Sequence, residues 1–183
     1  MTEPASKAVS EAAPEAVSPE AALAEDFKTA FREHPAAVAI IAARTSTGPV
    51  GLTASSVSSV AVAPATLSFS VTRATGSAGG LLEAGDVTVN LLNVEQEQLA
   101  LDFARSGAPR FTPEQGWEHF PTGEPYLPQA RETLRCRIAS TVKVGGSTIV
   151  LAEVLEVLHG SSIPPLMYQN RRFGRLDAHS FEA

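Results

Sequence analysis

Apolar residues near the start of the chain recur with the period of a helix. Leu23, Phe27 and Phe31 are spaced four residues apart within AALAEDFKTAFREH, so they fall on one face of a helix. The pattern begins at about Ala21, and Pro35 ends it because proline cannot continue a helix. The spacing therefore predicts one amphipathic helix at the beginning of the folded domain.

After Pro35 the pattern changes to short apolar segments separated by turn residues. This spacing is typical of a β meander or the beginning of a barrel, and not of a βαβ unit. The segments are AAVAIIAA at 36–43, VGLTASS at 50–56, SVAVA at 59–63 and TLSFSV at 66–71, with turns at Gly48, Pro49 and Pro64.

The second half of the chain combines helical and strand patterns. A short helix within 76–85 and a longer one over 94–106, capped by Asn93, are the helical segments. Residues 107 to 132 show neither period, which predicts a long ordered loop. Strands are expected at DVTVNLL, TLRCRIASTVKV and STIVLAEVLEVLHG. Six or seven strands with three helices favour a mainly β fold, a closed barrel with peripheral helices.

The N-terminal region differs in composition from the rest of the chain. Residues 1–20 consist mostly of Ala, Glu, Ser and Pro, the composition of a disordered acidic tail. Residues 1–26 contribute −5 of the formal net charge of −6, which leaves the remaining chain close to neutral. We therefore expect a tail over 1–20 and a single domain over 21–183, and we do not expect nucleic-acid binding.

The remaining composition narrows the class of protein further. No window approaches the roughly 18 apolar residues of a membrane span, and no signal-peptide pattern is present, so we expect a cytoplasmic protein. The single cysteine, Cys136, excludes an internal disulfide and alternates with two arginines, which predicts that it points into the core. The four histidines have no ligand spacing, so no metal site is expected.

Two short stretches carry candidate chemistry. GLTASSVSSV, which begins at Gly51, places small hydroxyl side chains where a planar ring could lie against a strand. VTRATGSAGGLL brings Arg73, Thr75 and Ser77 to the point where a strand leads into a short helix, an arrangement suited to a phosphate. Together they are compatible with a flat ring that carries a phosphate, whereas ordinary turns and caps explain each stretch equally well.

Several blocks of the sequence resemble the flavin reductase-like proteins with the FMN-binding split-barrel fold. These proteins are the reductase components of two-component flavin-dependent monooxygenases. The matching blocks are FREHPAAVAIIAA, PVGLTASSVSSVAVAPATLSFSV, RATGSAGGLLEAG with VTVNLL, GAPRF and PLMYQNRRFGRL, and together they cover about residues 25 to 177. The resemblance implies a split β-barrel, a homodimer, and FMN or FAD as the bound flavin.

The resemblance also implies which residues form the flavin site. Ring and ribityl contacts fall on Thr53, Ala54, Ser55 and Ser56, and the neighbouring strand contributes Asn90 and Leu91. The phosphate end falls on Ser70, Arg73, Thr75 and Ser77, and the C-terminal segment that closes over the site supplies Arg172 and Phe173. From its position in the long loop, we also expect Phe111, Trp117 and His119 to form a lid or to contact nicotinamide.

The function implied is reduction of FMN or FAD by NADH or NADPH, which supplies reduced flavin to a partner monooxygenase. Hydride transfer between stacked rings needs no protein acid, base or nucleophile, so no catalytic residue is expected. One departure weakens nicotinamide use, because Gly145, Gly146 and Ser147 stand where many relatives have Gly-Asp-His. A flavin carrier, sensor or accessory protein is therefore the alternative; a haem or pyridoxal protein is a third, for which the 51–56 region offers no haem ligand.

Overall fold

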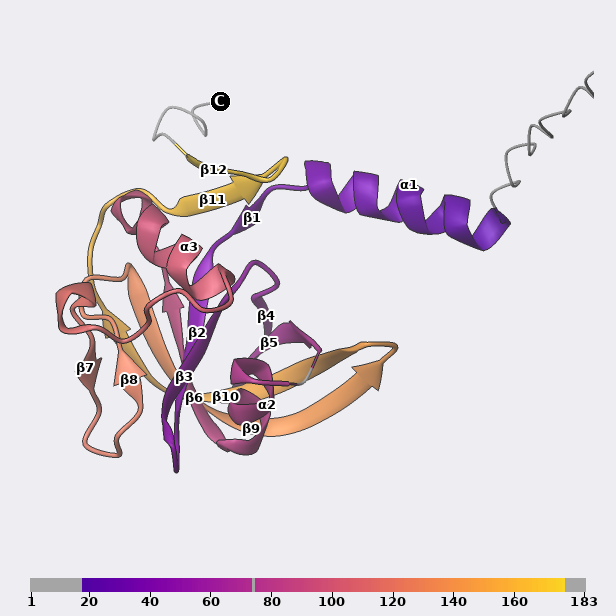
Figure 1. The fold of residues 1–183 in the computed structure, drawn as a ribbon. Coiled ribbons are helices and arrows are strands. Elements are labelled where there is room, and N and C mark those ends of the chain that lie inside the picture. Colours follow the sequence, from indigo (N-terminus) through magenta and orange to yellow (C-terminus); the bar gives the residue numbers. More distant parts are fainter. Residues whose placement is uncertain (1–17, 74, 177–183) are drawn as a thin grey trace, which may run out of the picture.

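The computed structural model describes residues 18–73 and 75–176 (Figure 1). Helix α1 (Pro19–Glu33) starts two residues before its predicted beginning, because the Ser18 hydroxyl caps it by accepting a hydrogen bond from the amide of Ala21 at 3.2 Å. It therefore includes the last two residues of the predicted tail. The remainder of that tail, residues 1–17, lies outside the described residues.

A seven-stranded antiparallel sheet forms the body of the molecule. Its strand order is β3-β2-β6-β9-β10-β5-β4. The two edge strands, β3 and β4, are not paired with each other, so the barrel is split, as the resemblance implied, and not closed, as the strand count favoured. The strands are β2 (Ala39–Thr45), β3 (Gly48–Ala54), β4 (Ser58–Val62), β5 (Ala65–Thr72), β6 (Asp86–Leu91), β9 (Glu132–Val144) and β10 (Ser147–His159).

Short strands and helices complete the fold around this sheet. A three-stranded sheet joins β1 (Ala36–Ala37) to the hairpin of β11 (Leu166–Gln169) and β12 (Arg172–Arg175). The long loop contains a second small sheet, β7 (Glu118–His119) with β8 (Pro125–Tyr126). The helices after α1 are α2 (Ser77–Glu83) and α3 (Glu97–Ala104), with short 3₁₀ turns at Val94–Gln96 and Pro113–Gln115.

Alternation of side chains along the strands produces two apolar clusters on opposite faces of the sheet. The cluster inside the barrel includes Phe69, Val89 and Cys136, so the predicted inward orientation of the cysteine is confirmed. The outer cluster, which includes Ile40 and Phe103, packs beneath α3, the long loop and the β11–β12 hairpin. This outer layer places α3 next to the hairpin at one end of the sheet (Figure 1).

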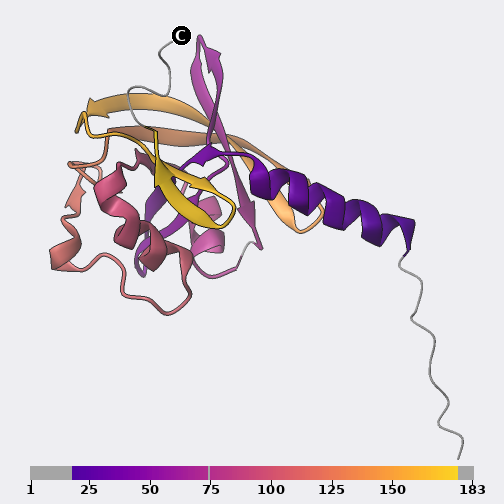
Figure 2. The ribbon, with the colours of Figure 1, turned by 90° about the horizontal axis from the view of Figure 1, so that it is seen from above.

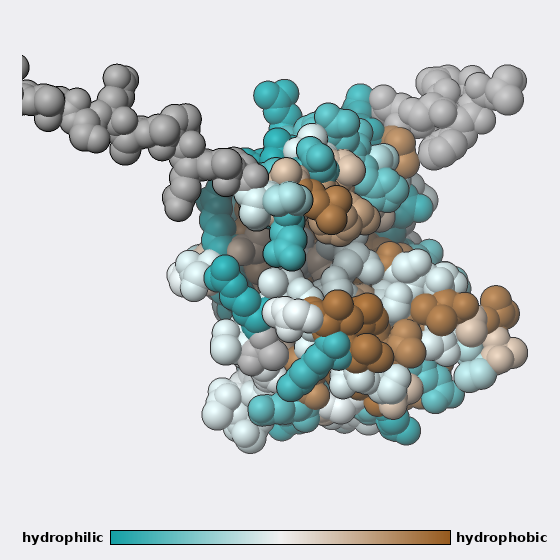
Figure 3. Space-filling view, turned by 90° about the vertical axis from the view of Figure 1, so that its right-hand side faces the viewer, coloured by the Kyte–Doolittle hydropathy of each residue, from teal (hydrophilic) through white to brown (hydrophobic). Residues whose placement is uncertain are grey.

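Helix α1 projects away from the body, with none of its residues buried (Figure 1). Its predicted apolar face is present, but Leu23, Phe27 and Phe31 are 69%, 61% and 62% exposed. Figure 3 shows hydrophobic residues gathered on the side of the molecule toward which this helix projects. No helix among the described residues is long and apolar enough to cross a membrane.

Candidate functional site

A groove with two connected lobes lies between the end of β3, helix α3, the β11–β12 hairpin and the base of α1. The first lobe has a volume of about 650 Å³ and the second about 960 Å³. Ser55, Tyr168 and Arg171 line both lobes, so the two form one continuous groove. Each lobe has the size of an ordinary small-molecule site, which gives the groove room for more than one ring system.

The first lobe is suited to a flat aromatic ring. Tyr168 and Phe173 form an aromatic pair on one wall, with ring centroids 5.2 Å apart. Thr53 also lines this lobe, and its hydroxyl is fixed by donating a hydrogen bond to the carbonyl of Ala100 at 2.6 Å. The Ser55 hydroxyl makes no hydrogen bond to any described residue and so is available to a ligand. Apolar walls with a few polar groups are the usual composition of a cofactor site.

Neighbouring residues at the end of β3 and just after it point to opposite faces of the sheet, as expected for a strand. Ala54 is buried inside the barrel, whereas its neighbour Ser55 opens into the groove. The Ser56 hydroxyl accepts a hydrogen bond from the amide of Ser70 at 2.9 Å, which fixes the turn after β3 against β5. Ser56 and Ser70 both line the second lobe. Of the predicted flavin contacts, Thr53, Ser55, Ser56, Ser70, Arg172 and Phe173 therefore lie along this groove.

The other predicted phosphate contacts lie on the turn between β5 and α2, outside both lobes. Arg73 has a φ of 57°, and its amide donates a hydrogen bond to the carbonyl of Gly146 at 3.0 Å. Gly146 belongs to the turn that stands where many relatives have Gly-Asp-His. That turn therefore lies directly beside Arg73. Thr75 is exposed and lines a separate cavity of about 800 Å³ with Gly80 and Arg44. The structure thus does not gather these residues with Ser70.

Arg110 is a residue that the sequence interpretation missed. Its guanidinium donates to the Ser77 hydroxyl at 3.0 Å, to the Gly51 carbonyl at 2.9 Å and to the Arg105 carbonyl at 2.7 Å. It also lies over the Phe103 ring, 5.6 Å from the centroid. These neutral partners leave its positive charge beside Ser77, since Arg110 forms no ion pair with a described carboxylate. The one sequence feature that pointed to Arg110 was its place in GAPRF, a block that resembles the family.

Asn90 and Leu91, which the resemblance assigned to the flavin ring, do not line either lobe of the groove, and their assignment stays a prediction. Asn90 is fully buried, and its amide donates to the carbonyl of Ile40 at 3.1 Å. Its side-chain oxygen accepts from the Leu127 amide at 2.9 Å and from the Thr133 hydroxyl at 3.0 Å. A side chain with its donor and acceptor both occupied in the core has no group left for a flavin. Leu91 packs against the cluster inside the barrel.

The predicted nicotinamide contacts also lie outside both lobes. Phe111 and Trp117 pack against each other with ring centroids 4.8 Å apart and against Phe103 at 5.0 and 5.3 Å, as part of the outer apolar cluster. His119 is exposed on β7. The positions of these three residues therefore do not support a lid over the groove. The loop and α3 are both packed against Gly51, where a Cβ would lie 3.1 Å from the Phe111 ring of the loop and 2.8 Å from the Phe103 ring of the helix.

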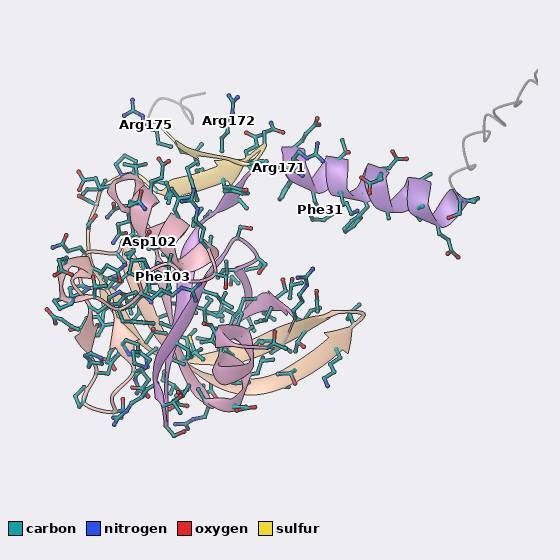
Figure 4. All side chains as sticks on the ribbon, in the orientation of Figure 1. Phe31, Asp102, Phe103, Arg171, Arg172 and Arg175 are labelled. Carbon is teal, nitrogen blue, oxygen red and sulfur yellow. The ribbon has the colours of Figure 1, made fainter. Side chains whose placement is uncertain are left out.

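The C-terminal hairpin covers one side of the groove and is joined to α1. Phe173 points toward Tyr168, whereas Arg172 is exposed at the rim (Figure 4). The side-chain amide of Gln169 donates to the carbonyl of Glu33 at 2.7 Å. This hydrogen bond satisfies a carbonyl at the end of α1. Figure 2 shows the hairpin tip beside this end of the helix.

Among the described residues, no group of three or more His, Cys, Asp or Glu side chains is arranged to hold a metal ion. The groove instead presents hydroxyls, an aromatic pair and guanidinium groups. These groups fit a flat ring with an anionic extension, which is the chemistry of a flavin nucleotide.

Comparison with known proteins agrees with this chemistry. Residues 31–177 match the family model described as flavin reductase like domain. The chain is 36% identical to the NADH:FMN oxidoreductase of Rhodococcus qingshengii over 157 residues, covering 83% of this chain and 81% of that one. It is 31% identical to the reductase component of an FADH2-dependent resorcinol hydroxylase from a Rhizobium species, covering 81% of this chain and 85% of that one.

A solved structure shows the same fold. The crystal structure of a flavin reductase domain protein from an Arthrobacter species superposes with a TM-score of 0.80 at 29% identity, covering 87% of this chain and 99% of that one. The family model covers most of the chain, and the relatives align along most of their own length. The chain therefore belongs to the flavin reductase like domain family.

Proposed function

We propose that this chain catalyses the reduction of FMN or FAD by NADH and supplies the reduced flavin to a partner monooxygenase. The observation that carries the proposal is the groove, whose first lobe is lined by Thr53, Ser55 and the Tyr168–Phe173 pair, in a member of the flavin reductase like domain family. The relatives named for NADH and FMN, and for a hydroxylase reductase component, support the donor, the flavin and the class of partner.

A bound flavin supplies the hydride-accepting ring, and NADH supplies the hydride. The residues of the chain have to orient two rings at contact distance and keep water away from them. Tyr168 and Phe173 provide an apolar wall for this purpose, and Thr53 and Ser55 provide the polar edge. The first lobe needs no side chain that exchanges a proton with the substrate.

The proposal retains the assignment of Ser70, Arg73, Thr75 and Ser77 to the phosphate end of the flavin. Arg110 is added to this group because its guanidinium contacts Ser77. FAD is included beside FMN because the hydroxylase reductase relative is named for FADH2.

The assembly and the location of the protein are also part of the proposal. We place a homodimer interface on the exposed apolar face of α1, since Leu23, Phe27 and Phe31 leave more apolar surface in water than a single helix normally exposes. A cytoplasmic location is proposed because NADH is available there and Cys136 requires no oxidising compartment. Residues 21–183 are proposed to act as one domain, preceded by the 1–20 tail.

The test is aerobic oxidation of NADH and NADPH by the purified protein, with FMN, FAD or no flavin added. We expect rapid oxidation of NADH that depends on added flavin. Flavin binding without turnover would instead favour the carrier, sensor or accessory alternative, for which the Gly145 to Ser147 turn is the specific reason.

A further inference from the structure

We propose that the second lobe of the groove binds the diphosphate of NADH, with Arg32 and Arg171 as its cationic ligands. This inference rests on the proposed function and adds a binding site to it. The two guanidinium groups come from distant parts of the sequence, the end of α1 and the turn between β11 and β12, and both line the second lobe. Figure 4 shows Arg171 at the hairpin tip, facing the base of α1.

Backbone hydrogen bonds hold the two arginines close together. The amide of Asn170 donates to the carbonyl of Arg32 at 2.8 Å, and Gln169 holds the next carbonyl, that of Glu33. Asn170 and Arg171 have φ values of 51° and 60°, the pair of positive values that defines a tight two-residue hairpin turn. The fold therefore brings the backbones of these two arginines together through an ordered turn, and both side chains line the same lobe.

Neither Arg32 nor Arg171 forms an ion pair with a described carboxylate. The one carboxylate that lines the second lobe, Glu25, is bound by Lys28 at 2.6 Å. The pKa of the Glu25 carboxyl is lowered mainly by Lys28 and in smaller part by the charge of Arg32, so Glu25 offsets only part of the positive charge of this pair of arginines. Because adjacent like charges repel each other, such a pair is most stable with an anion between its members. The lobe is therefore suited to a ligand with more than one negative charge.

The opposite wall completes a phosphate-type environment. Ser58 lines the same lobe as the arginines and is not assigned to the flavin, so its hydroxyl is available for this ligand; Ser56, next to it in the turn after β3, lines the lobe as well. Guanidinium groups on one side and hydroxyls on the other are the usual ligands of phosphate oxygens. A diphosphate would lie between the two walls.

Continuity with the first lobe identifies the ligand as the nicotinamide nucleotide. Hydride transfer requires the nicotinamide ring to stack on the flavin in the first lobe, so its diphosphate has to leave through an adjoining space. The second lobe adjoins the first at Ser55 and Arg171. The alternative candidates for nicotinamide contact, Phe111, Trp117 and His119, do not reach the groove. The diphosphate of FAD is the other source of the same chemistry, and the experiment separates the two.

The experiment uses the full chain with Arg32→Gln, Arg171→Gln and Arg171→Lys. Arg137→Gln is the matched control, because it removes one positive charge from an exposed ion pair with Asp86, outside the groove. KM is measured for NADH, FMN and FAD, together with the Ki of ADP-ribose, which carries the diphosphate without either redox ring. Each Gln variant should raise KM for NADH and Ki for ADP-ribose about tenfold, because each removes a charge-assisted hydrogen bond.

Arg32→Gln should leave KM for FMN and kcat within about twofold, because Arg32 lines the second lobe only. Arg171→Lys should retain part of the affinity for NADH because it keeps the charge. An increase in KM for FAD without an increase in KM for NADH would show that the lobe binds the diphosphate of the flavin, and would overturn the proposal. Equal increases for FMN and FAD, or no change in any constant, would also overturn it. If the wild-type protein oxidises no NADH, the proposed function fails, and calorimetric binding of ADP-ribose to wild type and Arg171→Gln then tests the site alone. Loss of binding in the variant would support the site, and absence of binding to wild type would refute it.

Discussion

Arg110 and Ser77 are joined by a hydrogen bond of 3.0 Å in which the guanidinium Nη1 donates to the serine hydroxyl oxygen. The same nitrogen donates to the carbonyl of Gly51 at 2.9 Å, so the start of α2 is tied to β3. Because the Ser77 oxygen accepts this bond, its own O–H remains free to donate to an anion. Arg110 is therefore a positioning residue for the hydroxyl that we place at the flavin phosphate.

Replacing Arg110 should weaken binding of FMN but not of riboflavin, which lacks the phosphate. We expect Arg110→Gln to raise the Kd of FMN about tenfold, with a smaller increase for Arg110→Lys, because lysine retains the charge but not the fork of donors. Quenching of flavin fluorescence measures both constants. Ser77→Ala should likewise raise the Kd of FMN and leave the Kd of riboflavin unchanged. Equal weakening of FMN and riboflavin would show that Arg110 only maintains the fold.

Replacing Asn90 tests whether this residue belongs to the core or to the flavin site. Asn90→Ala leaves the Leu127 amide without its buried partner and opens a small cavity. We expect the free energy of unfolding to fall by about 2–4 kcal/mol, measured by urea denaturation. KM for flavin should remain within about twofold. A large rise in KM at unchanged stability would support the assignment of Asn90 to the ring.

The contrast between Asn90 and Ser55 shows how far the sequence could predict the site. Both lie on apolar strands or at their ends, and the resemblance assigned both to the ring. Strand alternation predicts that neighbouring residues face opposite sides, but not which side has a helix over it. Ser55 opens into the groove, whereas Asn90 faces the outer cluster, where α3, the long loop and the hairpin exclude a ligand.

The arginine contacts were less predictable for a different reason. Arg32 and Arg171 are 139 positions apart in the printed sequence and meet only because the hairpin tip caps α1. Arg110 contacts backbone carbonyls of two other elements, and backbone acceptors have no sequence signature. The strands, the helices and the split-barrel fold follow from local patterns and from the resemblance. The contacts between distant elements required the structure.

The thiol of Cys136 should be unreactive in the native protein. Burial raises the pKa of this thiol from 9.0 to about 12, so almost no thiolate is present at pH 8. A disulfide reagent at pH 8 should modify the native protein only as fast as it unfolds, and should modify the protein in urea at once. Rapid modification without denaturant would contradict the burial of Cys136.

The same thiol should make stability depend on alkaline pH. Between pH 9 and 12 the unfolded thiol loses its proton while the native thiol keeps it, so stability due to this group decreases as pH rises through that window. From pH 8 to pH 10 the loss should be about 1.4 kcal/mol. Urea denaturation of wild type and Cys136→Ala at both pH values isolates this contribution from that of other groups. Equal pH dependence in the two proteins would contradict the raised pKa.

The apolar face of α1 should control the oligomeric state. Phe27 and Phe31 are in contact, with ring centroids 4.6 Å apart, and both are largely exposed in the single chain. Burial of one phenylalanine side chain stabilises an interface by about 2–3 kcal/mol, and a two-fold dimer contains each substitution twice. Phe27→Asp should therefore convert the dimer to a monomer at micromolar concentration, measured by light scattering after size-exclusion chromatography. Thr29→Asp adds the same charge to the opposite face of the helix and should leave the mass of the wild-type dimer unchanged. A monomeric wild type, or a dimer that Phe27→Asp does not dissociate, would show that α1 is not the dimer interface.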